Sequence, residues 1–362
     1  MVDGKARSIQ ETAAHAASET AKSRKAQYLS KKLQAVEVGH KSISELMHSF
    51  SQTGFQAKQL GAALDVMVDM LSDPDATIFF GYAGSMSTTG QWKIVRWLLE
   101  KRYVDVLVST GANISEDILD AMGYGYYQGS HVVDDEDLLR NQIDRFYDVY
   151  ADELQYREME NLIREFIGTA DPKRIYSSAQ FLHEFGKFQL ERGIESITAV
   201  AARQGIPVFS PAMADSGYGV AAFQAAKLDG KRVTVDQFKD FEQLGAIGNL
   251  AKETGVIYIG GGVPKDTIQL VAVIVDLARG GETTYPHKYA VQVTTDSPQW
   301  GGLSGCTFQE AVSWGKIDAK GKTAFCHCDA TIALPLLAHG LLERLNGKER
   351  KPPLDLRWVF KD

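Results

Sequence analysis

The sequence predicts an α/β protein built on a parallel sheet with helices on both faces. Short apolar runs recur along the chain, and each is followed by a glycine-rich or polar turn and then by a helical pattern. Strands of a parallel sheet are buried on both faces, so they show continuous apolar runs, and the chain returns through helices. This Rossmann-like arrangement predicts strands at 76–80, 104–110, 206–210, 256–260, 289–295 and 323–328.

Sheets of this kind bind ligands beyond the carboxyl ends of their strands. The functional loops are therefore expected at 81–90, 109–116, 211–219, 260–265, 295–305 and 329–330.

Three further segments have readable patterns. Residues 42–71 predict two amphipathic helices joined at Gly54, and the apolar run at 268–278 predicts a buried helix. The charged stretch between about 134 and 200 predicts a helical excursion between the two halves of the sheet, without chemistry of its own.

The N-terminal region differs in composition from the rest. Residues 5–35 are rich in Ala, Ser and Lys with little apolar periodicity, which is typical of a loosely held helix or a mobile arm. We expect an N-terminal helical arm over 1–50 and one large domain over 51–362.

Composition excludes some classes of function. The chain of 362 residues has a net charge of −7, which argues against nucleic acid as the main partner and is compatible with polycationic substrates. No apolar run is long enough to span a bilayer, and the N-terminus lacks an apolar signal core, so the cytoplasm is the expected location.

The three cysteines indicate a reducing compartment without disulfides. Cys326, His327 and Cys328 invite a metal interpretation. We disfavour it, because the spacing is not CxxC, no second ligand pair follows, and neighbouring residues of a strand point to opposite faces.

The segment WGGLSGCTFQEAVSWGKI at 300–317 concentrates candidate chemistry. Thr307 and Glu310 are spaced as a capping box that opens a short helix, Gly315 would end it, and Lys316 follows directly. Trp314 could desolvate the Lys316 amine, and desolvation is how imine-forming lysines are usually activated. The alternative is an ordinary solvated lysine.

A glycine-rich loop follows the first predicted strand. Gly81, Gly84 and Gly90, with the hydroxyl residues Ser85, Ser87 and Thr88, would present backbone N–H groups to a pyrophosphate at a helix start. The spacing is not GxGxxG, and glycines can simply permit a tight turn. The arrangement recurs at 109–111 and 260–262, and three such loops on one sheet edge favour a nucleotide site.

The octet EAVSWGKI at 310–317 closely resembles the active-site segment of the deoxyhypusine synthase family, and the similarity runs from about residue 76 to about residue 342. The resemblance implies an NAD-dependent transferase of aminobutyl groups (EC 2.5.1 type) in which Lys316 is the nucleophile. Trp314 would form a wall of the polyamine pocket, and Glu310 and Glu116 would face substrate ammonium groups or relay protons. From the residues alone, Glu116 could equally be an acid in the first turn of a helix.

The resemblance also implies the NAD contacts. Asp329 has the alternative role of a helix N-cap. The implied cofactor-binding residues are Gly84, Ser85, Met86, Ser87, Thr88, Thr110, Gly111, Ala112, Asp215, Gly261, Thr295, Asp329 and Ala330.

Enzymes of this family oxidise spermidine with NAD, capture the aminobutyl group on the lysine, pass it to an acceptor amine and reduce the product. The resemblance further implies a homotetramer with sites between paired subunits, and an N-terminal arm near a neighbouring subunit's active-site entrance.

The departures from the family pattern concern the amine site. Val220, Trp300, Leu303 and Ser115 stand where eukaryotic members have acids, and Asp266 stands where they have a histidine. Lost carboxylate partners weaken cation binding. We therefore expect a changed amine specificity, leaning towards a free diamine such as putrescine and homospermidine as product. A lysine of a translation initiation factor is the alternative acceptor.

Two other classes of function stay open. One is a non-catalytic paralogue that binds NAD, although such a protein has no reason to keep Lys316. The other is an unrelated lysine-imine enzyme that uses pyridoxal phosphate or works as an aldolase.

Overall fold

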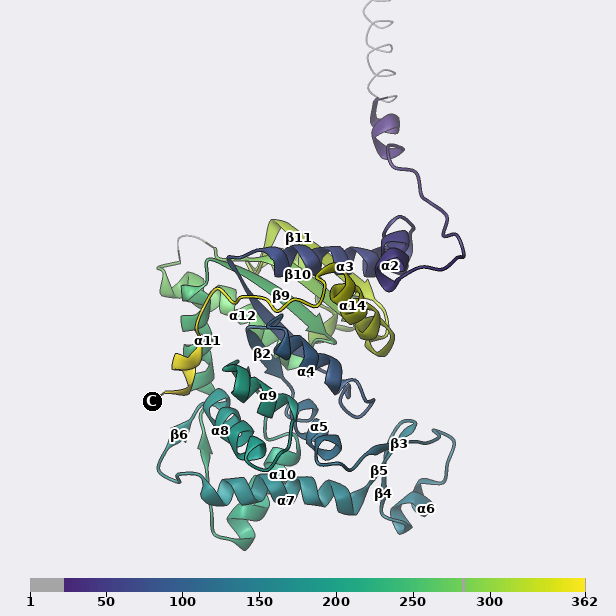
Figure 1. The fold of residues 1–362 in the computed structure, drawn as a ribbon. Helices are drawn as coiled ribbons and strands as arrows, with labels where there is room; N and C mark the ends of the chain where they lie inside the picture. The colour runs from purple at the N-terminus through teal and green to yellow at the C-terminus, as the bar shows by residue number, and fades with distance from the viewer. Residues whose placement is uncertain (1–22, 282–283, 362) are drawn as a thin grey trace, which may run out of the picture.

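A six-stranded parallel sheet forms the centre of the computed structural model, which describes residues 23–281 and 284–361 (Figure 1). The strand order is β11-β10-β9-β1-β2-β7. Their bounds are β1 Ala76–Tyr82, β2 Val106–Ser109, β7 Val208–Phe209, β9 Glu253–Ile259, β10 His287–Thr294 and β11 Ile317–His327.

All six predicted strands are confirmed, and so is the α/β fold class. The last strand begins at Ile317, six residues before its predicted start at Thr323, and pairs irregularly with β10 near its beginning. Residues 318–322 are mostly charged, so no apolar run marks this part of the strand.

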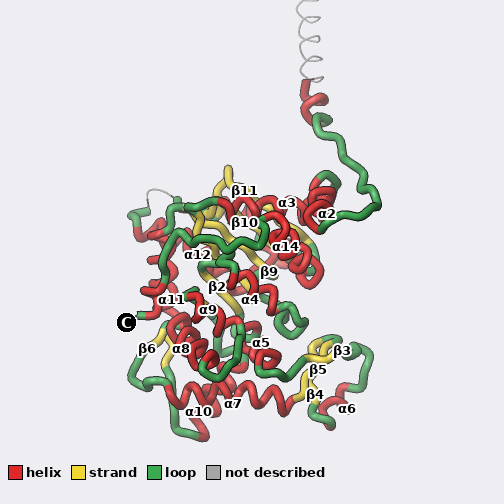
Figure 2. The backbone as a smooth tube through the Cα atoms, in the orientation of Figure 1, coloured by secondary structure: helices red, strands yellow, loops and turns green. Residues whose placement is uncertain are grey.

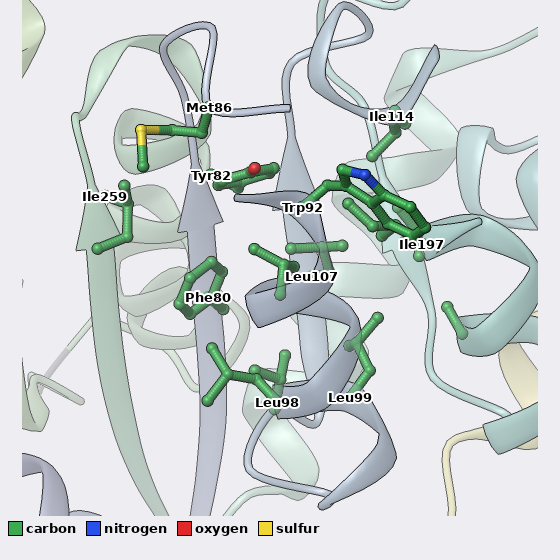
Figure 3. Close-up of a cluster of buried hydrophobic side chains, with 14 of the residues drawn as sticks. Phe80, Tyr82, Met86, Trp92, Leu98, Leu99, Leu107, Ile114, Ile197 and Ile259 are labelled. Carbon is green, nitrogen blue, oxygen red and sulfur yellow. The ribbon is translucent and has the colours of Figure 1, made fainter. Parts of the chain in front are cut away.

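Helices cover both faces of the sheet. On one face α3, α4 and α14 pack against residues such as Phe80 and Leu107, and Figure 3 shows these side chains beside Leu98 and Leu99 of α4. On the other face α11, α12 and α13 pack against residues such as Phe79. Adjacent residues of β1 thus serve opposite cores, as the alternation of a strand requires. The helix bounds are α3 Phe55–Ser72, α4 Trp92–Glu100, α11 Gln237–Leu250, α12 Gly262–Ala278, α13 Phe308–Ser313 and α14 Ala330–Arg344.

A layer of helices with a parallel strand pair, β6 and β8, lies beside the β2 and β7 side of the sheet (Figure 1). It accounts for much of the predicted helical excursion. Its elements are α5 Asn113–Ala121, α7 Glu153–Thr169, β6 Ile175–Tyr176, α8 Ser178–Leu190, α9 Ile197–Gln204, α10 Gly217–Leu228 and β8 Thr234–Val235.

A small antiparallel sheet lies at the start of this region, and the prediction of a helical segment between about 134 and 200 missed the two of its strands that fall in that range. Strands β3 (Tyr126–Gln128), β5 (Val149–Asp152) and β4 (Ile143–Phe146) pair in that order, with α6 (Asp135–Arg140) beside them (Figure 2). These strands are short and largely half-buried or exposed, so no alternation of apolar residues indicates them.

The N-terminal helices form as predicted, with α2 at Ile43–Ser51 and α3 starting after Gly54. Ser42 and Glu45 form a capping box, and the Glu343 carboxylate of α14 accepts from the N–H groups of Ile43 and Ser44. These bonds hold α2 against the body of the protein.

The described part of the arm extends away from the body (Figure 1). It is helical at 23–28 and lacks regular secondary structure over 32–41. Most of the arm predicted at 5–35 lies outside the described residues. Within the described ranges, no helix combines the length and apolarity needed to cross a membrane.

Three 3₁₀ turns, Pro298–Trp300, Leu303–Gly305 and Arg357–Phe360, complete the regular elements, and the third lies near the C-terminus. The first two belong to the loop that follows β10, which is the loop that leads to Lys316.

Candidate active site and nucleotide site

The sheet reverses its direction of growth between β1 and β9. From β1 the chain adds β2 and β7 on one side, and it then crosses to add β9, β10 and β11 on the other. The carboxyl ends of β1 and β9 therefore border the topological switch point, where α/β sheets bind their ligands. The loops that begin at Ala83 and Gly260 flank this point.

The loop after β1 has exposed residues at its start and buried, hydrogen-bonded residues after them. Gly84 has φ +81°, and a Cβ there would meet nothing within 4 Å, so a ligand can approach its backbone closely. Ser85 is exposed, whereas Met86, Ser87 and Thr88 are buried. The Ser87 hydroxyl donates to the Asn113 carbonyl oxygen at 2.6 Å, and that of Thr88 donates to the Ser85 carbonyl oxygen at 2.9 Å. Gly84 and Ser85 are therefore accessible to a ligand, whereas the buried residues Met86, Ser87 and Thr88 hold the shape of the loop.

The loop after β2 touches the loop after β7. A Cβ on Gly111 would lie 2.5 Å from the Ser216 hydroxyl oxygen, so only glycine fits this contact. Asp215 is exposed beside it.

Ala112, at the N-cap of α5, makes no side-chain cap, and the Asn113 N–H donates instead to the Thr110 hydroxyl at 3.4 Å. The N–H groups of Ser115 and Glu116 donate to the Ala112 carbonyl oxygen.

The loops after β10 and β11 complete the same sheet edge. Thr295 and Asp329 are both exposed. Asp329 is the N-cap of α14, where its carboxylate accepts from the N–H of Thr331 at 2.7 Å. Asp329 therefore acts as a helix N-cap, which was the alternative to a cofactor contact, and its Oδ1 atom already has a hydrogen-bond partner.

Three glycines after β9 fix the start of α12 against the 303–305 turn. A Cβ on Gly261 would lie 2.5 Å from the Cα atom of Ser304. The N–H of Gly262 donates to the Ser304 hydroxyl at 3.1 Å, and the Gln292 amide donates to the carbonyl oxygens of Gly260 and Ser304. These contacts join the loop after β9 directly to the 303–305 turn.

Lys316 lies in a pocket of about 270 Å³ on the α12 face of the sheet. The short helix predicted before it is confirmed: Thr307 caps α13, and Gly315 turns with φ +69°. The backbone of Lys316 is at the amino end of β11, where its carbonyl oxygen accepts from the His287 N–H. The pocket is lined by Lys265, Asp266, Gln269, Pro298, Gly301, Gly302, Leu303, Cys306, Glu310, Ala311, Trp314 and Lys316.

The Lys316 side chain is only 15% exposed. Its Nζ lies 5.4 Å from the centre of the Trp314 ring and 3.9 Å from Asp266 Oδ1. The other face of Trp314 is open, since this residue is 68% exposed, and the Glu310 carboxylate is at the exposed rim. The three predicted residues Lys316, Trp314 and Glu310 therefore share one pocket.

Glu116 does not line this pocket in the described chain. It lies at the start of α5, is 5% exposed, and its Oε2 atom has no hydrogen-bond partner among the described residues. Burial raises the pKa of this carboxyl to about 7. A buried acid without a partner is a group that a ligand can satisfy.

Sequence reasoning missed Lys265, which is 2% exposed. Its Nζ donates to the Cys306 carbonyl oxygen at 2.6 Å and to that of Ser304 at 3.4 Å. Burial lowers the pKa of this amine to about 8. In the sequence, Lys265 stands between three glycines and an apolar run, and this position could have indicated that the lysine is buried.

No grouping of three or more metal-ligating side chains occurs within residues 23–281 and 284–361. Cys306, Cys326 and Cys328 are free thiols. Cys326 is buried in the core of the α3 face, and burial raises its pKa to about 12.

A family model and the sequences of known proteins point to the same family. The family model for deoxyhypusine synthase matches residues 45–341. The protein "Probable deoxyhypusine synthase 2" of Methanosarcina mazei is 41% identical over 324 residues, which cover 88% of this chain and 92% of that protein. Its namesake in Archaeoglobus fulgidus is 44% identical over 292 residues, which cover 81% of this chain and 95% of its own.

The fold agrees with this assignment. A solved structure from Entamoeba histolytica, named for a deoxyhypusine synthase, superposes with a TM-score of 0.59 at 18% identity, covering 89% of this chain and 99% of that one. Over most of its length, the chain therefore belongs to the deoxyhypusine synthase family, whose members are NAD-dependent transferases of the aminobutyl group.

Proposed function

We propose that this chain transfers an aminobutyl group from a spermidine-type polyamine to an amine acceptor through an imine on Lys316. The observation that carries the proposal is the place of Lys316: a largely buried amine in a pocket that also presents Trp314, Glu310 and a second carboxylate. An amine held away from water beside acids and an aromatic face suits covalent capture of a cationic substrate.

The residues at the switch point fit NAD. The open backbone at Gly84 and the unpartnered Oε2 atom of Glu116 offer contacts that a dinucleotide would complete. When bound, NAD would take a hydride from the carbon beside the polyamine nitrogen and return it to the final product. We assign its contacts to Gly84, Ser85, Thr110, Gly111, Ala112, Asp215, Gly261, Thr295, Asp329 and Ala330, with Met86, Ser87 and Thr88 shaping the loop.

The side chains of the pocket divide the remaining work. Lys316 Nζ forms the new bond to the oxidised carbon, and the diamine fragment leaves with its nitrogen. Glu310 at the rim holds the distal ammonium of the substrate, and Trp314 covers the methylene chain. The acceptor amine then displaces Lys316 from the same carbon.

We propose a small diamine as acceptor, with homospermidine formed from putrescine. Support comes from the positions where acids are absent: Trp300 and Leu303 are 79% and 47% exposed near the pocket mouth, and Val220 is 39% exposed. Fewer carboxylates at these positions change the partners available to an amine, which supports an acceptor other than the protein lysine. The second candidate is modification of a lysine on a translation initiation factor, which the names of the two archaeal relatives favour.

We also propose a homotetramer, as the family resemblance implies. Light scattering of the purified full chain tests this directly: a mass of four chains supports it, and a stable monomer with full activity contradicts it.

The deciding experiment incubates the full chain with NAD and spermidine, alone, with putrescine, and with a lysine-bearing initiation factor. Mass spectrometry then identifies the products. Homospermidine in the putrescine reaction supports the diamine acceptor, whereas a modified factor with no homospermidine supports the second candidate. Binding of NAD without any product in the three reactions would identify a non-catalytic paralogue.

A further inference from the structure

Asp266 faces the nucleophile from a different element of the fold. It is the fifth residue of α12, lines the Lys316 pocket, and its Oδ1 atom lies 3.9 Å from Lys316 Nζ. Lys316 comes from the segment between α13 and β11, fifty positions later in the sequence. The pairing therefore arises from the packing of α12 against the lysine segment.

An ordinary structural role explains Asp266 poorly. An acid stabilises a helix through the dipole within the first turn, and Asp266 lies beyond the first turn of α12. Its chain neighbour Lys265 cannot be its cation, because that Nζ is bonded to the carbonyl oxygens of Ser304 and Cys306. A partly exposed ion pair contributes little to stability.

The chemistry of the proposed reaction needs a group at this place. An ammonium cannot attack an imine, so Lys316 must release a proton before it forms a bond. The nitrogen that leaves must in turn gain protons. One carboxylate beside Nζ can serve both needs, because it returns to its starting state after each transfer.

We propose that Asp266 is a catalytic residue that carries protons from Lys316 Nζ to the departing nitrogen. This inference rests on the proposed function. Asp266 takes a proton from Nζ, the Nζ electron pair forms the bond to the imine carbon, and the C=N pair moves to the substrate nitrogen, which takes that proton. A second proton then moves from Nζ through Asp266 to the same nitrogen, its bond to carbon breaks, and the new imine to Lys316 forms. Two protons leave Nζ, and the leaving amine carries both.

The distance of 3.9 Å is longer than a hydrogen bond. Catalytic hydrogen bonds are often long in unliganded proteins and shorten when substrate binds. The Asp266 side chain is 43% exposed, so it has room for this approach. Glu310, the other acid of the pocket, lies on α13 at the exposed rim and remains available for the substrate ammonium.

The test measures two steps separately: oxidation of the polyamine, which precedes the action of Lys316, and formation of the adduct on Lys316. NADH formation, followed by ultraviolet absorbance after mixing enzyme, NAD and spermidine, reports oxidation of the polyamine. Borohydride reduction followed by peptide mass mapping reports the aminobutyl adduct on Lys316. The variants are Asp266→Asn, which keeps the shape but removes the base, and Asp266→His, which restores a proton acceptor. Asp276→Asn on the same helix is the matched control.

We expect Asp266→Asn to slow adduct formation by on the order of 10² to 10³-fold while NADH formation and the melting temperature stay near wild-type values. Asp266→His and Asp276→Asn should form the adduct within about tenfold of the wild-type rate. Undiminished adduct formation in Asp266→Asn would overturn the inference and leave the proposed function intact. Equal losses of NADH and adduct in both Asp266 variants would also overturn it, since they indicate a structural role. A wild-type enzyme without any adduct would instead reject the proposed function itself.

Discussion

Lys265 Nζ donates a hydrogen bond of 2.6 Å to the backbone carbonyl oxygen of Cys306, although only 2% of the lysine is exposed. A buried amine costs free energy unless it loses its charge or finds partners. Here it also donates to the Ser304 carbonyl oxygen and so ties the start of α12 to the loop that leads to Lys316. The site therefore depends on a buried cation that is not itself the nucleophile.

Replacing Lys265 by methionine should change how stability depends on pH. Burial lowers the pKa of Lys265 to about 8 in the folded protein. Between about pH 8 and pH 10.5 the folded protein has therefore lost this proton, while the unfolded chain still holds it. Wild-type stability should therefore rise relative to Lys265→Met over this interval, by on the order of 2 kcal/mol. Urea unfolding of both proteins at pH 7.5 and pH 10 measures the difference, and a constant difference contradicts the lowered pKa.

Glu116 predicts a pH dependence in the opposite direction. Its folded pKa is raised to about 7, so the folded protein keeps a proton that the unfolded chain loses above about pH 4.5. Relative to Glu116→Gln, the wild-type protein should lose stability as pH rises from about 4.5 to above 7. Asp117 next to it is also buried with a raised pKa and remains in both proteins. Unfolding free energies at pH 5 and pH 8 decide this, and a difference that does not change with pH shows that Glu116 is ionised throughout.

Gly261→Ala should damage both stability and activity. Its Cβ would lie 2.5 Å from the Ser304 backbone, which cannot move without displacing the 303–305 turn. Overpacking of this kind costs about 1 to 3 kcal/mol. Gly302→Ala is the matched control, because a Cβ there meets nothing within 4 Å and φ is −72°. Thermal unfolding should separate the two variants, and equal melting temperatures would show that the turn yields freely.

Gly84→Ala should weaken NAD binding more than Gly90→Ala does. Both glycines have φ near +80° and open space around a Cβ, so the backbone strain of the two substitutions should be similar, about 1 to 2 kcal/mol. Only Gly84 borders the proposed pyrophosphate contact after β1. Calorimetric titration of each variant with NAD tests this, and the same affinity in both variants would place the cofactor elsewhere.

The sequence predicted the strands of the central sheet well because all of them except β11 are largely buried on both faces. Residues 76–80 form an apolar run that needs no tertiary information to be recognised. By contrast, β3, β4 and β5 pair through largely half-buried or exposed residues, and the early part of β11 is mostly charged. No apolar pattern marks strands whose side chains face solvent.

The same division applies to the site. Glu310, Trp314 and Lys316 lie within seven residues, so their proximity followed from one short helix and its end. Lys265 reaches the pocket because α12 packs beside the loop after β10, and a sequence does not display this contact. Asp266 was placed at the amine site only through the family resemblance, and it does line the pocket. Lysine is also a residue type that is rarely buried, so its type alone predicts the surface.

The central claim is that Lys316 carries the four-carbon amine. The most direct measurement mixes the full chain with NAD and spermidine, reduces the mixture with borohydride, and maps the modified peptide by mass spectrometry, with Lys316→Arg as the matched control. We expect an aminobutyl adduct on Lys316 alone in the wild-type protein and neither adduct nor product in the variant. Product formation by Lys316→Arg at the wild-type rate, or an adduct on another lysine, would contradict it.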